Sequence, residues 1–341
     1  MRVLHLLASP VFSGPAEGVA LLAAAQQRAG ANVSVAVDTT RPGTGTEEPS
    51  VPRFEALGLL DARGLALSTR RGPFSFLADA VRLRRASVDV VHCHSTHDHW
   101  LAWVARPRTA RLVRSVHAPR SLRWSLPPAA AFTVPALELL PRLRPGPALV
   151  LPPLVDRTHF RPSADRAALR LSLGLPPGPV VGMASTFQPS RGHSVALAAF
   201  ALVRRRVPDV TLVLVGDGVL EPAVRLSVWE AGLSDAVHLP GYQRGAEFVR
   251  WLQALDEVWV LGLGNDWAGR TALQARACGA RVVTSALGGL PTWADAVLPE
   301  VTPEALAAAA LREDRREVQL PDEDSVARDV LALYRSAGAS A

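Results

Sequence analysis

Short apolar runs alternate with helical segments along the whole chain. The first run, Arg2 to Ala8, meets a turn-forming cluster around Gly14, and a helix is predicted from about Ala16 to Arg28. Because these runs read as near-continuous Val and Leu, they are typical of parallel strands covered on both faces. Further strands are predicted at Val33–Val37, Val88–His94, Arg111–His117, Ala131–Val134 and Ala148–Leu151, further helices at Phe76–Arg85 and Asp98–Ala105, and a surface loop at residues 41–53.

A proline-rich segment from Pro152 to Pro162 interrupts this alternation, which then starts again. The second series has strands at Val180–Ala184, Val210–Val215, Val237–Leu239, Val258–Leu261 and Arg281–Thr284, with helices ending near Arg206, Ala231, Leu255, Gly279 and Ala309. We predict an α/β fold with two Rossmann-like domains, residues 1–152 and 153–322, facing each other across a cleft. A final helix within residues 323–341 is expected to cross back to the first domain.

The stretch after Val258–Leu261 has the form of a ligand-binding turn. It passes through glycines into an alanine-rich helix that Gly279 closes, with Arg270 and Thr271 in the first turn. Free N–H groups at a helix start suit an anion, usually a phosphate. Arg191 stands before a second helix start, so the two sites together favour a diphosphate cradle, although a lone arginine at such a position is more often a surface charge.

Four histidines, at positions 92, 94, 97 and 99, lie within eight residues. His92 and His94 share one face of a strand, whereas His97 and His99 are predicted on the following turn, so we expect no shared metal. Most of these are interpreted as ordinary loop histidines. His94 and His117 are exceptions, because both end adjacent strands at the sheet edge where ligands bind. Either could donate a hydrogen bond to a substrate hydroxyl or take part in proton transfer.

Composition narrows the class of protein. The chain has 341 residues, 48% of them hydrophobic, which is enough for two full cores. Its two cysteines, Cys93 and Cys278, cannot build a disulfide framework or a four-ligand zinc site, so a reducing, cytoplasmic location is expected. No apolar run is long enough to span a membrane.

Charge is unevenly distributed along the chain. All 37 basic residues are arginine, and residues 1–150 hold 18 of them against 10 acidic residues, a net charge of +8. Without a recognisable binding motif, nucleic acid is not the expected partner. An anionic acceptor, the anionic inner face of a membrane, or a simply solvated face remain as interpretations. No nucleophile-elbow, Walker or Gly-x-Gly-x-x-Gly motif follows the first strand. The chain therefore lacks the loops that are typical of hydrolases, P-loop proteins and dinucleotide-binding dehydrogenases.

In order and spacing, several segments resemble family 4 glycosyltransferases, which are retaining enzymes of the two-domain GT-B type. The segments are Ser13-Gly14-Pro15, Val88–His94, Val155–Pro162, Arg191-Gly192-His193 with Ala198–Phe200, Leu212–Gly218, Leu239–Tyr242, Asp256, Gly269–Gly279 and Gly288–Pro291. The resemblance implies that the second domain binds a nucleotide-sugar and the first receives the acceptor.

Site residues follow from the same resemblance. It implies catalytic roles for His117, Arg191 and Asp266, with His117 and Gly14 brought over the sugar diphosphate by cleft closure, and an acceptor-side position for His94. The implied donor-binding residues are Gly14, Thr186, Arg191, Gly216, Tyr242, Asp266, Gly269, Arg270, Thr271 and Gln274.

Four of these positions depart from the family pattern. Thr186 replaces the usual arginine five residues before Arg191, and Arg191 itself replaces a lysine, which keeps the charge and gains a bidentate fork. Asp266 and Gln274 stand where the family carries two glutamates. Losing one charge-assisted hydrogen bond at Gln274 would weaken donor binding roughly tenfold.

The sequence therefore predicts a hexosyltransferase-type enzyme that moves a sugar from a nucleotide-diphosphate-sugar to a cell-envelope or polysaccharide acceptor, free or lipid-linked. It is expected to need neither metal nor cofactor, and to be cytoplasmic with possible peripheral contact at an anionic inner membrane face. A nucleotide-sugar-binding protein that has lost transfer activity is the alternative, and Thr186 and Gln274 motivate it. A nucleotide-sugar epimerase is less favoured, because its paired acid–base carboxylates are not apparent.

Overall fold

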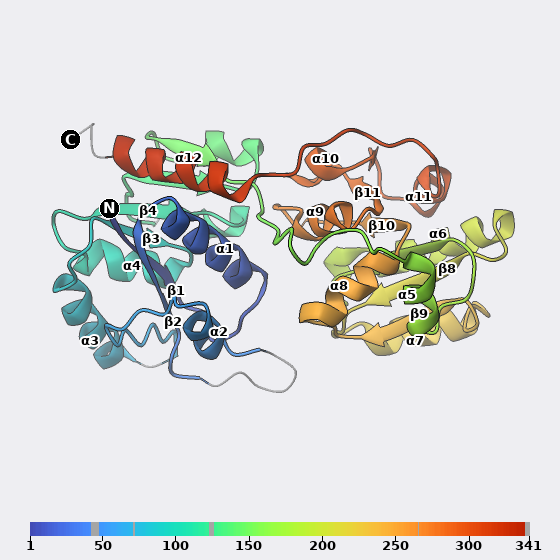
Figure 1. Ribbon diagram of the computed structural model, residues 1–341, viewed down its shortest axis with the longest axis horizontal. Coiled ribbons are helices and arrows are strands. Elements are labelled where there is room, and N and C mark those ends of the chain that lie inside the picture. The colour runs from blue at the N-terminus through green and yellow to red at the C-terminus, as the bar shows by residue number, and fades with distance from the viewer. Residues whose placement is uncertain (42–47, 71, 123–125, 265, 338–341) are drawn as a thin grey trace. The chain divides into compact units, whose positions relative to one another are not determined.

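The computed structural model describes residues 1–41, 48–70, 72–122, 126–264 and 266–337, and the remaining residues, including 42–47 of the predicted loop and Asn265, lie outside the described part. The described chain forms two compact units (Figure 1). One comprises Met1–Leu154 together with Pro321–Ala341, and the other comprises Val155–Leu320. The boundaries predicted from the sequence fall two residues from these junctions.

The first unit is built on a six-stranded parallel sheet in the order β2-β1-β3-β4-β5-β6. Its strands are β1 (Arg2–Leu7), β2 (Asn32–Val37), β3 (Val90–Cys93), β4 (Arg111–Ser115), β5 (Ala131–Val134) and β6 (Ala148–Val150). Its helices are α1 (Gly14–Arg28), α2 (Ser50–Ala56), α3 (Pro73–Arg84), α4 (Thr96–Ala105) and α12 (Glu323–Ser336), with 3-10 turns at Pro119–Ser121 and Leu137–Arg142.

Alternation along β1 assigns its side chains to the two faces of this sheet. Val3 and Leu7 pack under α1 and α12, whereas Leu4 and Leu6 pack with residues of α3 and α4. α12 belongs here because Val326, Val330 and Tyr334 complete the first of these clusters. In Figure 1 the red α12 accordingly lies with the first unit, although it follows the whole second unit in the chain.

The second unit repeats the architecture with a six-stranded parallel sheet in the order β12-β11-β10-β7-β8-β9. Its strands are β7 (Val180–Ala184), β8 (Thr211–Val215), β9 (Val237–Gly241), β10 (Glu257–Val260), β11 (Arg281–Ser285) and β12 (Ala296–Leu298). Its helices are α5 (Arg166–Ser172), α6 (His193–Arg206), α7 (Glu221–Glu230), α8 (Gly245–Ala254), α9 (Arg270–Ala277), α10 (Leu290–Trp293) and α11 (Pro303–Ala309), with a 3-10 turn at Pro189–Arg191.

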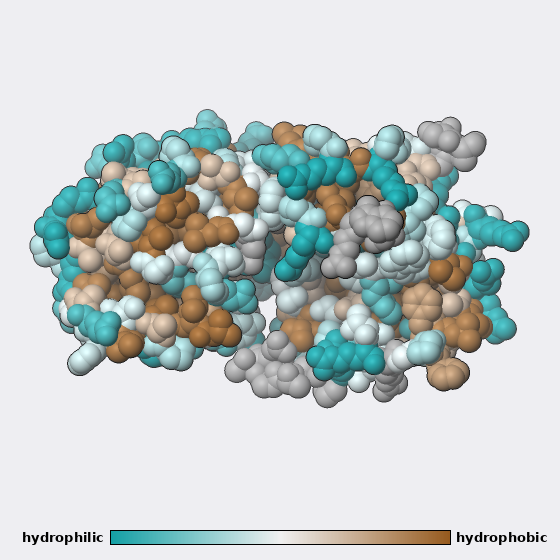
Figure 2. Space-filling view, turned by 180° about the vertical axis from the view of Figure 1, so that it is seen from behind, coloured by the Kyte–Doolittle hydropathy of each residue, from teal (hydrophilic) through white to brown (hydrophobic). Residues whose placement is uncertain are grey.

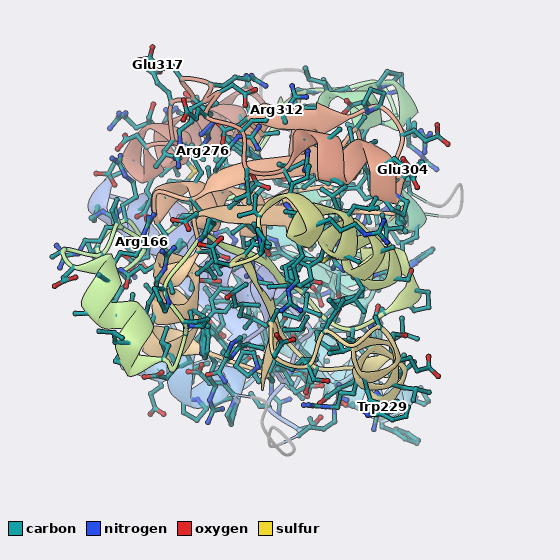
Figure 3. The ribbon with its side chains drawn as sticks, turned by 90° about the vertical axis from the view of Figure 1, so that its right-hand side faces the viewer. Arg166, Trp229, Arg276, Glu304, Arg312 and Glu317 are labelled. Atoms are coloured by element: carbon teal, nitrogen blue, oxygen red, sulfur yellow. The ribbon has the colours of Figure 1, made fainter. Side chains whose placement is uncertain are left out.

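Helices cover both faces of the second sheet, so the predicted α/β class with two Rossmann-like units is confirmed. Seen end-on, the second unit presents Trp229 of α7 at its periphery, and this side chain is 71% exposed (Figure 3).

Two local predictions were wrong. Residues 41–53 are not one loop, because α2 begins at Ser50 and buries Phe54 in the core under α1. Gly14 does not lie in a turn before the helix predicted from Ala16 but is the first residue of α1, where Pro15 fits the first turn.

Candidate functional site

The topological switch point of the second sheet lies between β7 and β10, where the strand order reverses. Open α/β sheets bind ligands at the carboxyl ends of such strands. Arg191 follows β7 and Asp266 follows β10, and their side chains form an ion pair with 2.6 Å between Nη1 and Oδ2. The two side chains are 22% and 15% exposed, so the pair lies partly buried at the sheet edge. The structure thus joins two of the residues that the sequence assigned to catalysis.

Two helices begin at this edge, each after a left-handed glycine. Gly192 precedes α6 with φ of 76°, and Gly269 precedes α9 with φ of 68°. A Cβ on Gly269 would lie 2.8 Å from Cδ1 of Trp293, so only glycine fits there. Arg270 and Thr271 occupy the first turn of α9, as predicted. The free N–H groups of both helix starts make the switch point suited to an anion.

Asp266 holds an unusual backbone conformation, with φ of 154°. Residues with a side chain seldom adopt such angles, and they cost on the order of 1–3 kcal/mol where they occur, often at functional sites. The carboxylate is thereby turned toward Arg191.

Gln274 is buried in α9, and its Oε1 has no hydrogen-bond partner among the described residues. An unpaired buried acceptor costs about 1–3 kcal/mol unless a ligand donates to it. Gln274, which the resemblance implies to be a donor-binding residue, therefore carries an acceptor with free capacity.

Thr186, Gly216 and Tyr242 come together through backbone hydrogen bonds at the same edge. The residues flanking Thr186 pair with those flanking Gly216, since Ser185 N donates to Val215 O at 3.0 Å and Phe187 N donates to Asp217 O at 2.6 Å. Gly216 N donates to the carbonyl of Gly241, the neighbour of Tyr242. Thr186 and Tyr242 are exposed, so both side chains are accessible beside the switch point.

His193 is a site residue that sequence reasoning missed. It is the first residue of α6, it is buried, and its Nε2 lies 3.4 Å from Ser185 Oγ. Burial, and secondarily the charge of Arg191, lower the pKa of His193 to about 4. The imidazole is therefore neutral at physiological pH. The signal available in the sequence was its place two residues after Arg191, in the segment Arg191-Gly192-His193.

The first unit has its own switch point, between β1 and β3. His94 follows β3 there, and its Nε2 lies 2.9 Å from Nδ1 of His5 on β1. His117 follows β4, is exposed, and stacks on His94 with 5.8 Å between ring centroids. The proximity of the two predicted histidines is thus confirmed. Sequence reasoning missed His5, which is paired in register with His92.

A buried hydrogen-bonded network extends from His94 and His5 beneath α1 and α12. Its links are His94 Nε2 to His5 Nδ1 (2.9 Å), His5 Nε2 to Gln26 Oε1 (2.9 Å), Gln26 Nε2 to Tyr334 OH (3.1 Å), Tyr334 OH to His92 Nδ1 (2.6 Å), His92 Nε2 to Ser115 Oγ (2.8 Å) and Ser115 Oγ to Thr133 Oγ1 (2.6 Å). We call it the histidine network. It connects β1, β3, β4 and β5 with α1 and α12.

His97 and His99 lie on α4, not on a turn, because Ser95 and Asp98 form a capping box that starts the helix at Thr96. The histidine that joins His92 and His94 is instead His5. One ligand atom from each of these three lies within 4.8 Å of the others, a spacing open to metal binding. All their ring nitrogens except His94 Nδ1 already have protein partners, so the cluster fits a hydrogen-bonded network better than a ligand set.

Burial keeps these imidazoles neutral. It lowers the pKa of His5 to about 4 and the pKa values of His92 and His94 well below their ordinary range. The two switch points therefore differ in charge, since an ion pair occupies one and uncharged rings occupy the other.

Comparison with known proteins connects both units to one family. Residues 12–181 match the family model described as Glycosyltransferase Family 4, and residues 178–313 match that described as Glycosyl transferases group 1. The chain is 37% identical over 147 residues to a D-inositol 3-phosphate glycosyltransferase of Segniliparus rotundus, covering 42% of this chain and 32% of that protein. It is 32% identical over 213 residues to a GDP-mannose-dependent phosphatidylinositol monomannoside mannosyltransferase of Mycolicibacterium smegmatis, covering 54% and 55%. The matched segments thus span about half or less of these relatives.

Solved structures support the fold. Anabaena HepE in complex with UDP and glucose superposes with a TM-score of 0.71 at 17% identity, covering 98% of this chain and 97% of that one. Sucrose-phosphate synthase from Thermosynechococcus elongatus gives 0.73 at 18% identity over the whole of both chains. Both family models agree with the two-unit architecture and together reach from residue 12 to residue 313. The chain therefore belongs to the family 4 glycosyltransferases and has their GT-B fold.

Proposed function

We propose that this protein transfers a sugar from a nucleotide-diphosphate-sugar to a cell-envelope or polysaccharide acceptor with retention of anomeric configuration. The observation that carries the proposal is the switch point of the second unit, where two helix starts and Arg191 meet beside the unpaired carbonyl of Gln274. Relatives named as D-inositol 3-phosphate glycosyltransferases and a structural neighbour holding UDP-glucose support this substrate class.

The chemistry assigned to the chain's own residues is mainly electrostatic. Arg191, Arg270 and the first N–H groups of α6 and α9 stabilise the negative charge that develops on the leaving diphosphate. Gln274 accepts a hydrogen bond from a ribose hydroxyl. Asp266 holds Arg191 before the donor binds, and neither a metal nor a cofactor is required by this scheme.

The alternative is a protein that binds nucleotide-sugars without transferring them. Thr186 and Gln274 motivate it, as does the ion pair itself, because Asp266 already neutralises Arg191. An anion must then compete with Asp266 for the guanidinium. The two proposals share the donor site and differ in turnover.

Calorimetric titration with UDP and GDP, followed by assays of UDP-glucose and GDP-mannose hydrolysis and transfer, tests the proposal. Arg191→Ala should weaken nucleotide-diphosphate binding at least tenfold, the effect of losing about 1.4 kcal/mol or more. Arg225→Ala is the matched control, because that arginine pairs with Glu221 on the exposed side of α7 and should leave binding unchanged.

Binding with turnover, both lost in Arg191→Ala, supports the transferase. Binding of a nucleotide without turnover of any donor favours the alternative. Absence of binding for every nucleoside diphosphate contradicts both.

A second proposal concerns the membrane. On α3 the exposed apolar residues are Phe74, Leu77 and Val81, and on the adjacent α4 they are Trp100, Trp103 and Val104. We call this the α3–α4 face. Brown, hydrophobic side chains gather at the edge of the first unit where α3 lies (Figure 2). Among the described residues, no helix is both long and apolar enough to cross a bilayer.

Charge on the α3–α4 face suits an anionic surface. The two acidic residues of these helices, Asp79 and Asp98, are buried, where Asp79 accepts from the Ala66 and Leu67 N–H groups and Asp98 caps α4. The charge is supplied by Arg82 and Arg84 on α3, by Arg85 directly after it, and by Arg106 and Arg108 after α4. An apolar face with an arginine rim is the composition of an interfacial membrane anchor, so we propose peripheral attachment at the anionic inner face.

Flotation with phosphatidylglycerol vesicles tests this attachment. The wild-type protein should float and the double variant Phe74→Ser/Trp103→Ser should remain in the soluble fraction. Trp229→Ser removes an exposed aromatic from the second unit, and this variant should float normally. A wild-type protein that stays in the soluble fraction at low salt contradicts the proposal.

A further inference from the structure

The histidine network has one unsatisfied end. His94 Nδ1 has no hydrogen-bond partner among the described residues, and the side chain is only 5% exposed. A buried polar atom in this state costs about 1–3 kcal/mol, and such atoms call for a specific explanation. The atom lies on the residue that follows β3 at the switch point of the first unit, where an α/β sheet binds its ligand.

The network fixes which kind of group His94 Nδ1 can bind. Gln26 donates from Nε2 to Tyr334, so its Oε1 faces His5 and accepts the proton on His5 Nε2. A neutral His5 then carries no proton on Nδ1, which accepts from His94 Nε2. A neutral His94 that donates from Nε2 has a lone pair on Nδ1.

We infer that His94 Nδ1 is a hydrogen-bond acceptor for a hydroxyl group of the substrate bound at the first unit. This deepens the proposed function, on which it rests for naming that substrate as the glycosyl acceptor. The direction is opposite to the expectation from sequence that His94 donates to a hydroxyl, because its single proton is committed to His5. A fully deprotonated phosphate or carboxylate oxygen, which brings no proton, is excluded from this point.

Tyr334 and Gln26 act as positioning residues for His94. Gln26 is buried in α1 and contacts both His5 and Tyr334. Because its Nε2 donates to Tyr334, its Oε1 must accept from His5, and this fixes which ring nitrogens of His5 and His94 carry the protons. The other end of the network passes through His92 to Ser115 and Thr133, whose hydroxyls serve as donor or acceptor. The direction is therefore set by the Gln26 amide, which reaches His94 through His5.

Nitrogen NMR of histidine-labelled full-length protein tests the inference without any activity measurement. His94 is expected as the Nε2–H tautomer, with Nδ1 at the chemical shift of an unprotonated nitrogen. Addition of myo-inositol, a neutral polyol, should shift His94 Nδ1 toward the hydrogen-bonded range, whereas sulfate, an anion without a proton, should leave it unchanged. An Nδ1–H tautomer, or a response to sulfate and not to the polyol, overturns the inference.

Variants separate positioning from stability. Tyr334→Phe removes the acceptor of the Gln26 amide and the donor to His92, so His94 should become a mixture of tautomers in a protein that remains folded. Arg28→Gln is the matched control, because it removes the exposed ion pairs between α1 and α12 without touching the network. An unchanged tautomer in Tyr334→Phe removes Tyr334 from this role.

Substitutions of His94 itself test the contact. In His94→Gln the amide replaces Nε2 and keeps a partner for His5, whereas in His94→Asn the amide replaces Nδ1. If transfer is established, the Gln variant should raise the acceptor KM about tenfold with unchanged donor binding, and the Asn variant should recover part of that loss. Equal acceptor KM values in wild type and His94→Gln contradict the contact. A transferase that fails in every assay leaves the NMR result intact, so the two failures can be distinguished.

Discussion

The two units place different chemistry at the same topological position. In the second unit the switch point carries an ion pair, Arg191 with Asp266, shaped by left-handed glycines. In the first unit it carries neutral rings, His5 with His94, held by side-chain hydrogen bonds that reach into the core. A charged, glycine-shaped edge suits a diphosphate, and an uncharged edge with a fixed lone pair suits a hydroxyl. The same position in the fold is thus suited to an anion in one unit and to a neutral group in the other.

The largest expected difference between the two units is their loss of stability at acidic pH. The pKa of His5 is about 4 in the folded protein against 6.5 when unfolded, so below pH 6.5 the unfolded state takes up the proton first. Stability should be constant above pH 6.5, fall as the pH drops toward 4, and level off below that. The loss from His5 alone is about 3 kcal/mol at pH 4, and His92 and His94 add to it.

Urea unfolding at pH 8 and pH 5, followed by hydrogen exchange of peptides from each unit, measures this effect. The first unit should lose more stability than the second, in which His193 is the buried histidine with a comparably lowered pKa. The pKa values of His99 and His117, which also belong to the first unit, are likewise lowered to about 4 by desolvation. Equal losses in both units would contradict the assignment of acid sensitivity to the histidines of the first unit.

Backbone substitution should affect the second unit next most strongly. A Cβ on Gly216, whose φ is 137°, would lie 2.1 Å from the Ser185 carbonyl oxygen, so Gly216→Ala should cost about 3 kcal/mol. Gly18→Ala is the control, because nothing lies within 4 Å of a Cβ in the middle of α1. It should be stabilising by about 0.5–1 kcal/mol. Chemical denaturation of both variants checks the contrast, which fails if the Gly216 variant is as stable as wild type.

The smallest expected effect concerns strain at Asp266. The φ of 154° strains any residue with a side chain, and glycine should relieve this strain. Asp266→Gly should therefore be about 1 kcal/mol more stable than Asp266→Ala, although both variants lose the ion pair. The pair is partly exposed and contributes at most about 1 kcal/mol to stability. Thermal unfolding of the two variants provides the comparison, and equal stabilities would show that the angle carries no strain.

The sheets were predictable because parallel strands that are buried on both faces consist almost entirely of apolar residues. The Val- and Leu-rich runs from Arg2 and from Val258 became β1 and β10, and the glycine turn before Arg270 became the start of α9. The helix α2 was missed because Pro49 and Pro52 indicate a turn, while burial of Phe54 decides the outcome. Local propensity gave way there to tertiary packing.

The sites were predictable as residues but not as contacts. Asp266 and Arg191 were each identified, yet nothing in the sequence pairs them across 75 positions. His5 was not identified from the sequence, and its role depends on Gln26 and on Tyr334, which lies 308 residues after Gln26. Contacts of this separation arise only when the sheet and α12 are assembled.

The placement of α12 has a consequence for biosynthesis. The first unit needs Val330 and Tyr334 to complete its core, but a ribosome adds them only after all of Val155–Leu320. Until then the groove over α1 is open, and Gln26 and His92 lack their shared hydroxyl partner. The unit translated first is therefore the last to mature, and a chain stalled before residue 323 exposes an incomplete core to chaperones and proteases.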